Sequence, residues 1–243
     1  MSSPQSRGLS LWIAGLVVAV ALTGCSSLPT FRLSDLPTTV SVVDRGQDIL
    51  VLPRSVPTKP LGVLFYPGGF VKPEAYLPAL IPLVEAGYPT LIAKMPFDLA
   101  FLDPEKGVSL LGSVPSVHHW VIAGHSLGGV AAAMAVDRHP GVFAGLVLWA
   151  SYPASGNNLS QATIPVLSIS ASNDGLSTPA KVDAAAGLLP ANTQKVVVEG
   201  GNHGQFGSYG LQKGDDVPVL TREAQQAAVA KETLTFLDRL ERP

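Results

Sequence analysis

The sequence predicts an α/β protein with a mainly parallel central sheet and helices on both faces of that sheet. Two observations support this prediction. Short apolar runs, the usual form of buried strands, alternate with segments whose apolar residues recur at helical spacing. The chain also has 24 glycines and 21 prolines among 243 residues, as expected where many tight turns connect strands to helices. This length fits one ordinary domain, which we expect over residues 39–243.

The expected elements follow one another in a regular alternation after an initial pair of strands. Most of the strands are continuous apolar runs, as in a parallel sheet that is buried on both sides. The expected strands are 39–43, 49–52, 61–66, 90–93, 117–123, 145–149, 165–170 and 195–198. The expected helices are 75–86, 130–136, 179–188 and 222–240. Residues 95–116 are expected to be irregular, apart from a candidate helix around 99–102.

The N-terminus has the pattern of a targeting segment. The almost wholly apolar run at 9–22 is too short to span a bilayer comfortably and matches the hydrophobic region of a signal peptide. Leu-Thr-Gly-Cys at 22–25 resembles the lipobox of a bacterial lipoprotein. This resemblance implies cleavage before Cys25, lipidation of Cys25 and anchoring to the cell envelope. A plain secretory signal and an uncleaved anchor are the alternatives. We expect 1–25 to lie outside the fold and 26–38 to form a flexible tether.

Charge and cysteine usage exclude several classes of function. Charged residues make up 14% of the chain and the formal net charge is −2, with no basic run, so no nucleic-acid partner is expected. The single cysteine excludes an internal disulfide framework and a cysteine-rich metal site. His118 and His119 are adjacent on an expected strand, where their side chains diverge. We expect neither a metal nor a cofactor, and the sequence indicates no oligomeric state.

The strand at 117–123 runs into Gly124–Gly129, whose sequence is Gly-His-Ser-Leu-Gly-Gly. A strand, a tight turn and a helix, with serine at the apex of Gly-x-Ser-x-Gly, are typical of the nucleophile elbow of serine hydrolases. Such a turn lifts the Ser126 hydroxyl clear of the sheet, and Gly124 and Gly128 leave room for the neighbouring backbone. Ser126 is therefore the candidate nucleophile. The alternative is an ordinary strand-to-helix turn with a capping serine.

A serine hydroxyl needs a base beside it, and in hydrolases with this elbow the chain order is serine, acid, histidine. Two histidines follow Ser126. His203 comes directly after the last expected strand, where the base is required, and imidazole can take and return a proton near neutral pH. His139 lies at the wrong end of the elbow helix. We therefore expect His203 to be the base.

The acid that orients the base should follow the preceding strand. Asp174 meets this requirement, within an Asn-Asp-Gly sequence, and would hold the tautomer of His203 and stabilise its cation. Glu199 is the rival acid, because it is close to His203 in sequence, but it falls at the end of the expected strand. The other acidic residues of this region fall inside a helix or far along a loop: Asp183, Asp215 and Asp216.

An oxyanion that forms during ester cleavage needs hydrogen-bond donors. The backbone N–H of Leu127, at the start of the elbow helix, is one candidate. The second should come from the loop after the strand at 61–66, where two glycines allow close approach of the backbone to a carbonyl oxygen. We favour the N–H of Gly69, with Phe70 as the alternative.

Five segments together resemble the α/β-hydrolase superfamily, and more narrowly its compact dienelactone-hydrolase-related group, α/β-hydrolase family 5. They are Tyr-Pro-Gly-Gly at 66–69, the elbow at 124–129, Ser-Tyr-Pro-Ala at 151–154, Asn-Asp-Gly at 173–175 and Glu-Gly-Gly-Asn-His-Gly-Gln-Phe-Gly at 199–207. The resemblance implies the α/β-hydrolase fold, a triad of Ser126, Asp174 and His203, and the same oxyanion loop. It implies no particular substrate. Dienelactone hydrolases usually have a cysteine nucleophile, whereas this chain has serine.

The substrate pocket is expected to be open. Many members of this fold have a cap between the two strands that follow the elbow helix, but here the interval 150–164 is too short for a cap domain. An apolar pocket would favour an ester with a hydrophobic acyl or alcohol part, and no Arg or Lys is placed to clamp a phosphate or carboxylate. The candidate pocket walls are Phe70, Trp149 and Tyr152, with Phe97, Leu99 and Phe101 near other strand ends.

The sequence therefore predicts a serine hydrolase, anchored to the cell envelope through Cys25, that cleaves a small ester-like molecule through an acyl-enzyme on Ser126. One alternative is a non-catalytic envelope lipoprotein that uses the same fold as a binding module. Another is a hydrolase of thioesters, lactones or peptides.

Overall fold

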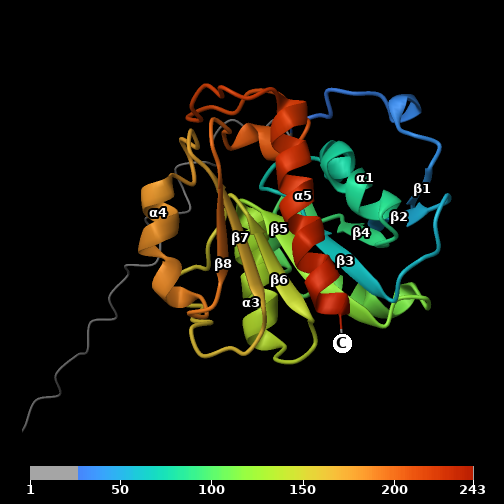
Figure 1. The fold of residues 1–243 in the computed structure, drawn as a ribbon, viewed down its shortest axis with the longest axis horizontal. Helices are drawn as coiled ribbons and strands as arrows, with labels where there is room; N and C mark the ends of the chain where they lie inside the picture. The colour runs from blue at the N-terminus through green and yellow to red at the C-terminus, as the bar shows by residue number, and fades with distance from the viewer. Residues whose placement is uncertain (1–26, 243) are drawn as a thin grey trace, which may run out of the picture.

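The computed structural model describes residues 27–242. Its strands span Val40–Asp44 (β1), Asp48–Pro53 (β2), Leu61–Tyr66 (β3), Thr90–Ala93 (β4), His119–His125 (β5), Gly145–Trp149 (β6), Val166–Ala171 (β7) and Gln194–Val198 (β8). They form one sheet in the order β1-β2-β4-β3-β5-β6-β7-β8 (Figure 1). β2 is antiparallel to β1 and β4, and every other neighbouring pair is parallel. The predicted mainly parallel sheet is confirmed.

Helices cover both faces of this sheet. The α-helices span Leu77–Glu85 (α1), Lys106–Leu110 (α2), Leu127–Arg138 (α3), Pro179–Ala184 (α4) and Arg222–Glu241 (α5). α1 and α5 pack against each other on one face, and α2 and α3 lie on the opposite face (Figure 1). Short 3₁₀ turns lie at Leu33–Asp35 (η2), Pro73–Tyr76 (η3), Pro96–Asp98 (η4), Ala100–Leu102 (η5), Leu111–Ser113 (η6), Ala186–Leu188 (η7) and Gly204–Phe206 (η8). The connection at 150–165 contains no helix, as expected for a fold without a cap domain.

The core consists of two apolar layers, one on each face of the sheet. In β3, Val63 and Phe65 belong to the layer under α1 and α5, whereas Leu64 and Tyr66 belong to the layer under α3. Successive side chains of a strand point to opposite faces. Because both faces of the sheet are buried here, both sets of side chains are apolar. The strand therefore appears in the sequence as one continuous apolar run and shows no alternation of apolar and polar residues.

Local backbone chemistry changes the predicted helix bounds. The helix predicted at 75–86 begins as the 3₁₀ turn η3, and α1 starts only at Leu77. Pro78 has no N–H to donate to the carbonyl of Glu74, which instead accepts from the Leu77 N–H in a 3₁₀ bond. The helix predicted at 179–188 ends at Ala184, and η7 follows it; no side chain of α4 is buried. The stretch predicted to be irregular, 95–116, contains α2 and three 3₁₀ turns.

The described part of the segment expected to be a tether lies against the domain. Ser27 pairs in parallel with Val71, and its N–H donates to the carbonyl oxygen of Phe70 at 2.7 Å. Three residues later, the Thr30 N–H donates to the carbonyl oxygen of Ser208 at 2.8 Å. Phe31 and Leu36 also pack against the core. We call residues 27–36 the N-terminal strap. The expectation of a flexible tether is corrected for this part, because these backbone pairs and apolar contacts bind it to the domain.

The predicted signal peptide, including Cys25, lies outside the described residues. Within residues 27–242, no helix has the length and apolar character needed to cross a membrane.

Replacing Gly128 by alanine should destabilise the fold. A Cβ at this position would overlap the carbonyl oxygens of Tyr66 and Pro67, and backbone shifts that relieve such overlap cost about 3 kcal/mol at the upper end of overpacking effects. Urea unfolding followed by tryptophan fluorescence measures the loss. Gly187→Ala is the matched control, since a Cβ there meets no atom within 4 Å. Equal stability of the two variants would contradict the prediction.

Candidate active site

The candidate residues come together at one edge of the sheet. β3, β5, β6, β7 and β8 are parallel, so their carboxyl ends lie at the same edge. In Figure 1 this edge lies at the top, where α5 begins. The loop after β3 contains Gly69, β5 leads into Ser126, and the loops after β7 and β8 contain Asp174 and His203. We call it the catalytic edge.

Ser126 occupies a strained turn between β5 and α3. Its φ is 52° and its ψ is −126°, a backbone conformation that residues other than glycine rarely adopt. Hydrogen bonds hold the turn: the Ser126 N–H donates to the carbonyl oxygen of Trp149 at 3.0 Å, and the Ser151 hydroxyl donates to the carbonyl oxygen of Ser126 at 2.7 Å. The Ser126 side chain is partly exposed. This is the conformation that the elbow motif predicts.

Glycines allow the backbones around Ser126 to touch. A Cβ on Gly124 would come within 2.5 Å of the backbone of Gly128, and a Cβ on Gly129 would come within 2.5 Å of the Ser151 side chain. Gly128 itself lies against the end of β3. The N-terminus of α3 is therefore held beside the loop that contains Gly69, with its positive end at the catalytic edge.

Asp174 and His203 form a buried hydrogen-bonded pair. His203 Nδ1 lies 2.8 Å from Asp174 Oδ2, and both side chains are almost completely buried. Asp174 Oδ1 accepts the N–H groups of Leu176 at 2.8 Å and Ser177 at 2.6 Å. These donors orient the carboxylate and offset the cost of burying its charge. Because the carboxylate accepts, the proton of a neutral His203 lies on Nδ1 and Nε2 keeps its lone pair.

His203 Nε2 has no hydrogen-bond partner among residues 27–242, so this structure contains no hydrogen bond between His203 and Ser126. The His203 ring lies 4.5 Å from the ring of His125, the residue before Ser126, measured between centroids. The structure thus brings the base next to the elbow without joining it to the serine hydroxyl. Such contacts are often long before substrate binds. Glu199, the rival acid, is exposed and lies one residue beyond β8.

The two oxyanion candidates after β3 have different surroundings. The Phe70 N–H donates to the carbonyl oxygen of Asp98 at 2.8 Å, so it is already engaged. The N–H groups of Gly69 and Leu127 have no partner within the described chain. A Cβ on Gly69 would come 2.6 Å from Leu127 Cδ1, so these two residues face each other. This arrangement favours Gly69 over Phe70 as the second donor.

Tyr76 and His125, which were not among the predicted site residues, support the loop that contains the candidate oxyanion donor Gly69. The Tyr76 hydroxyl accepts the Gly68 N–H at 2.9 Å and lies 2.9 Å from His125 Nδ1. Burial raises the pKa of the Tyr76 phenol. Burial, followed by the charge of His203, lowers the pKa of the His125 imidazole well below its usual value. Both groups are therefore neutral, and Tyr76 donates to His125. Position within the elbow motif was the one signal that pointed to His125.

Asp215 joins the loop of the acid to the loop of the base. Its Oδ1 accepts the N–H of Gly175 at 3.2 Å and that of His203 at 3.1 Å, and its Oδ2 accepts the N–H of Gly204 at 2.8 Å. Asp215 is not the acid that orients the His203 ring, since Asp174 occupies that position. Its contacts with both loops were not predicted, because they form only when the loop that contains Asp215 folds back over these two segments. No sequence pattern identifies such a long-range contact.

The structure places the main candidate pocket residues, Phe70, Trp149 and Tyr152, in different surroundings. Tyr152 is partly buried, and burial followed by the charge of Asp174 raises the pKa of its phenol, which places it near the site. Phe70 is also partly buried. Trp149 is fully buried, and its indole N–H donates to the Thr233 hydroxyl at 3.2 Å. The prediction that Trp149 lines the pocket is therefore wrong: its side chain points into the core under α5.

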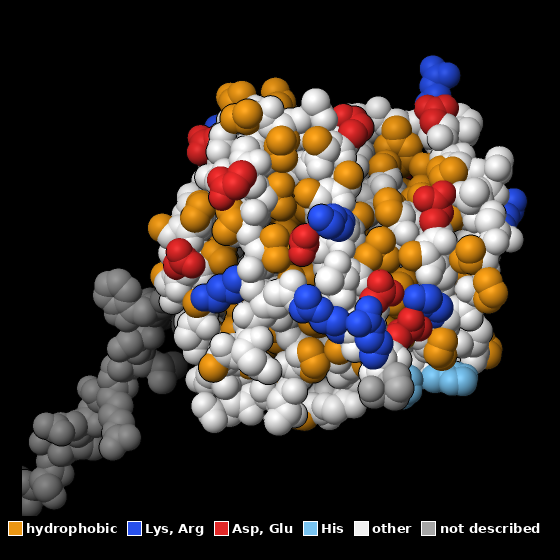
Figure 2. Space-filling view, in the orientation of Figure 1, with side chains coloured by type: hydrophobic (Ala, Val, Ile, Leu, Met, Phe, Trp, Pro, Cys, Tyr) orange, Lys and Arg blue, Asp and Glu red, His pale blue; other side chains and the backbone are white. Residues whose placement is uncertain are grey.

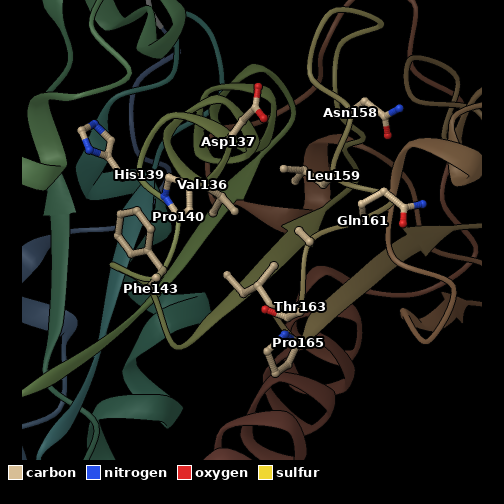
Figure 3. Close-up of a pocket in the computed structure, with 13 residues that line it drawn as sticks. Val136, Asp137, His139, Pro140, Phe143, Asn158, Leu159, Gln161, Thr163 and Pro165 are labelled. Carbon is tan, nitrogen blue, oxygen red and sulfur yellow. The ribbon is translucent and has the colours of Figure 1, made fainter.

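A separate cavity of about 500 Å³ lies at the opposite edge of the sheet. Figure 3 shows His139 and Phe143 from the end of α3 and the following turn on one side, and Leu159 and Gln161 from the connection between β6 and β7 on the other. None of its lining residues is a candidate catalytic residue. Residues 27–242 also contain no group of three or more side chains that could hold a metal ion.

Solved structures share this fold at low sequence identity. Est1E from Butyrivibrio proteoclasticus is 14% identical, with a TM-score of 0.57, 84% of this chain covered and 99% of that chain. TT1662 from Thermus thermophilus is 18% identical, with a TM-score of 0.61 and the same two coverages. A predicted CIB-like hydrolase from Thermoplasma acidophilum is 15% identical, with a TM-score of 0.57, 82% of this chain covered and 96% of that chain. No curated protein matches the sequence significantly.

The family comparison covers most of the domain. The model of the alpha/beta hydrolase family matches residues 62–227, from β3 into α5, and so includes the elbow and the loops of Asp174 and His203. Together with the parallel sheet, this match is decisive for the family and for the general activity. The chain belongs to the alpha/beta hydrolase family and is a hydrolase.

Proposed function

We propose that this hydrolase cleaves carboxylic esters, with Ser126 as nucleophile, His203 as general base and acid, and Asp174 as the group that orients His203. The observation that supports this most strongly is the buried pair of His203 Nδ1 and Asp174 Oδ2 at 2.8 Å, beside the strained turn of Ser126. Within the part of the chain that the structure describes, His203 Nε2 has no hydrogen-bond partner. Acyl transfer requires a base with a free lone pair next to a serine whose hydroxyl is held clear of the sheet.

In the first half-reaction, His203 Nε2 takes the proton of Ser126 Oγ as that oxygen attacks the ester carbonyl carbon. The negative charge passes to the carbonyl oxygen, where the N–H groups of Leu127 and Gly69 can donate to it. Asp174 stabilises the cation of His203 through Nδ1. When the carbonyl re-forms, the bond to the alcohol oxygen breaks, the alcohol takes the proton from Nε2, and the acyl group stays on Ser126.

In the second half-reaction, a water molecule replaces the alcohol. His203 takes one proton of that water as its oxygen attacks the acyl carbon, and the same two N–H groups stabilise the oxyanion. Collapse breaks the bond to Ser126 Oγ, which recovers its proton from Nε2. The products are the carboxylic acid and the free enzyme. Thioesters and lactones can react by the same steps, so the ester assignment rests on the lack of a helical cap at 150–165 and on the partly buried aromatic side chains of Phe70 and Tyr152.

The rival role, a binding module without catalysis, leaves the polar site unexplained. Burying His203 and Asp174 has a desolvation cost, and binding without catalysis gives no reason for it. The strain at Ser126 is a further cost without benefit to binding. Both features are useful to an enzyme, because they hold the nucleophile and the base in place before substrate arrives.

We further propose that the protein is anchored to the cell envelope through lipidated Cys25. The support is the apolar run at 9–22, followed by Leu-Thr-Gly-Cys at 22–25. Cys25 is the single cysteine of the chain. Several acyl chains on one residue bind a bilayer far more firmly than one chain does.

A fluorophosphonate probe should label the folded protein at Ser126, because the probe reacts with serines activated by a base. Ser126→Ala should abolish both labelling and turnover of p-nitrophenyl esters, with a drop in kcat of at least about 10³-fold. Mass spectrometry of the labelled peptide identifies the modified residue. Wild-type labelling at another serine, or undiminished turnover in Ser126→Ala, would contradict the proposed nucleophile.

Asp215→Asn should slow ester turnover while leaving the fold intact. The amide keeps the shape of the carboxylate but places an NH₂ group against a backbone N–H, and it weakens hydrogen bonds that contribute about 1.5–3 kcal/mol when one partner is charged. We expect kcat/KM to fall about tenfold or more. The exposed neighbour Asp216 provides the matched control, Asp216→Asn. Equal kinetics of the two variants would show that Asp215 does not position the base.

A further inference from the structure

The N-terminal strap begins at the oxyanion loop. Ser27 donates its N–H to Phe70 at 2.7 Å and accepts the Lys72 N–H at 3.2 Å. Cys25 precedes Ser27 by two residues, and each residue spans at most about 3.6 Å. The lipid attachment point therefore lies within about 7 Å, along the chain, of a residue paired with the oxyanion loop. An uncleaved apolar segment ending at Leu22 would also enter the fold at this place.

The strap continues across the catalytic edge. Thr30 donates to the carbonyl of Ser208, five residues after His203, and its hydroxyl accepts from Arg222 Nη1 at 3.2 Å at the start of α5. In Figure 1 the blue start of the described chain passes the upper end of α5. The strap is thus attached to the loops on both sides of the site, so the described chain enters the domain at the catalytic edge.

Exposed apolar side chains concentrate at this same edge. Among the large hydrophobic residues of the described chain, the four most exposed are Leu211 (95%), Phe97 (83%), Val217 (83%) and Val219 (81%). Phe97 follows the carboxyl end of β4, and the other three lie in the loop between η8 and α5. Figure 2 shows hydrophobic side chains gathered at the upper left, over that loop. Leu28, in the strap, is 67% exposed.

Backbone contacts tie these side chains to the catalytic loops. The Asn173 amide, next to Asp174, donates to the carbonyl oxygen of Val217 at 3.2 Å. Val219 donates to the carbonyl oxygen of Gly200, in the loop that contains His203. Similarly, Asp98, which follows Phe97, accepts the N–H of Phe70 in the oxyanion loop. The exposed apolar groups therefore surround the site and are held by the same segments that form it.

We infer that the catalytic edge docks on a lipid bilayer and that the substrate is an ester whose acyl chain partitions into that bilayer. The inference rests on the proposed hydrolase activity and envelope anchor. It goes beyond them because an anchor alone does not orient the domain. The bilayer is the occupant that the structure favours, since the N-terminal anchor segment joins the domain at this edge and the most exposed apolar side chains lie beside it. Docking then shields Leu211 and its neighbours from water and delivers the ester to Ser126 without passage through solvent.

Tryptophan quenching in vesicles tests the orientation. The full chain is reconstituted into phosphatidylcholine vesicles with brominated acyl chains, as Leu211→Trp or as the matched variant Val142→Trp. Val142 is also an exposed hydrophobic residue, 43% exposed, but lies after α3 at the opposite edge. The native tryptophans give both variants the same background. We expect brominated lipid to quench Leu211→Trp fluorescence more than wild-type fluorescence, and to leave Val142→Trp at the wild-type level.

Each other outcome overturns the docking inference. Equal quenching at both positions would mean that no particular edge faces the lipid. An unquenched Leu211→Trp in protein that floats with the vesicles and still reacts with fluorophosphonate would refute docking and leave the hydrolase and anchor proposals standing. Protein that does not float would refute the anchor and docking together, while fluorophosphonate labelling would still report on the hydrolase. A dimer in detergent that Leu211→Asp dissociates would identify a second copy as the occupant.

Turnover gives a second readout of the same inference. The double variant Leu211→Asp/Val217→Asp places charges on the proposed lipid-facing loop, and Val142→Asp is its control. For a long-chain ester embedded in vesicles, we expect the double variant to lose about tenfold in rate. A short, water-soluble p-nitrophenyl ester should be hydrolysed at the wild-type rate, which also shows that the site is intact. Equal losses on both esters would overturn the inference.

Discussion

The geometry of the catalytic edge depends on the close approach of α3 to the end of β3. Gly128 has no side chain, so its backbone lies against the carbonyl groups of Tyr66 and Pro67. This contact sets the start of the elbow helix beside the loop after β3, and Leu127 therefore faces Gly69. The strain at Ser126 persists because the surrounding strands and Ser151 hold both ends of the turn. Packing of main chain on main chain thus positions the proposed nucleophile Ser126 and the two candidate oxyanion donors.

Burial governs the chemistry of His203, the proposed base. His203 and Asp174 are almost inaccessible to water, and each charge-bearing oxygen of Asp174 has a donor within 2.8 Å. The Asp215 carboxylate accepts three backbone N–H groups and so joins the loop that contains Asp174 to the loop that contains His203. His125 lies directly against the His203 ring, and its lowered pKa keeps it neutral, so it adds no positive charge beside the base. A rigid, low-dielectric site of this kind strengthens the interaction of Asp174 with a protonated His203.

The N-terminal strap connects this site to the part of the chain that precedes the domain. Ser27 pairs with the loop that contains Gly69, and Thr30 pairs with the loop that follows His203. The described chain therefore enters the domain at the catalytic edge. The proposed docking on a lipid surface gives one explanation for the exposed apolar side chains at that edge, Leu211 and Phe97 among them, which lie in three separate segments of the chain.

Local patterns in the sequence determined the α/β class, most element positions and the candidates Ser126, Asp174 and His203. Apolar runs, glycine spacing and the position of a residue after a strand act over a few residues, so they are visible in one dimension. The tertiary structure alone decided the roles of Asp215 and Tyr76, the burial of Trp149 and the attachment of the strap. Each of these depends on segments distant along the chain that meet only when the sheet forms. A residue's distance from the catalytic motifs in sequence therefore carried no information about its distance in space.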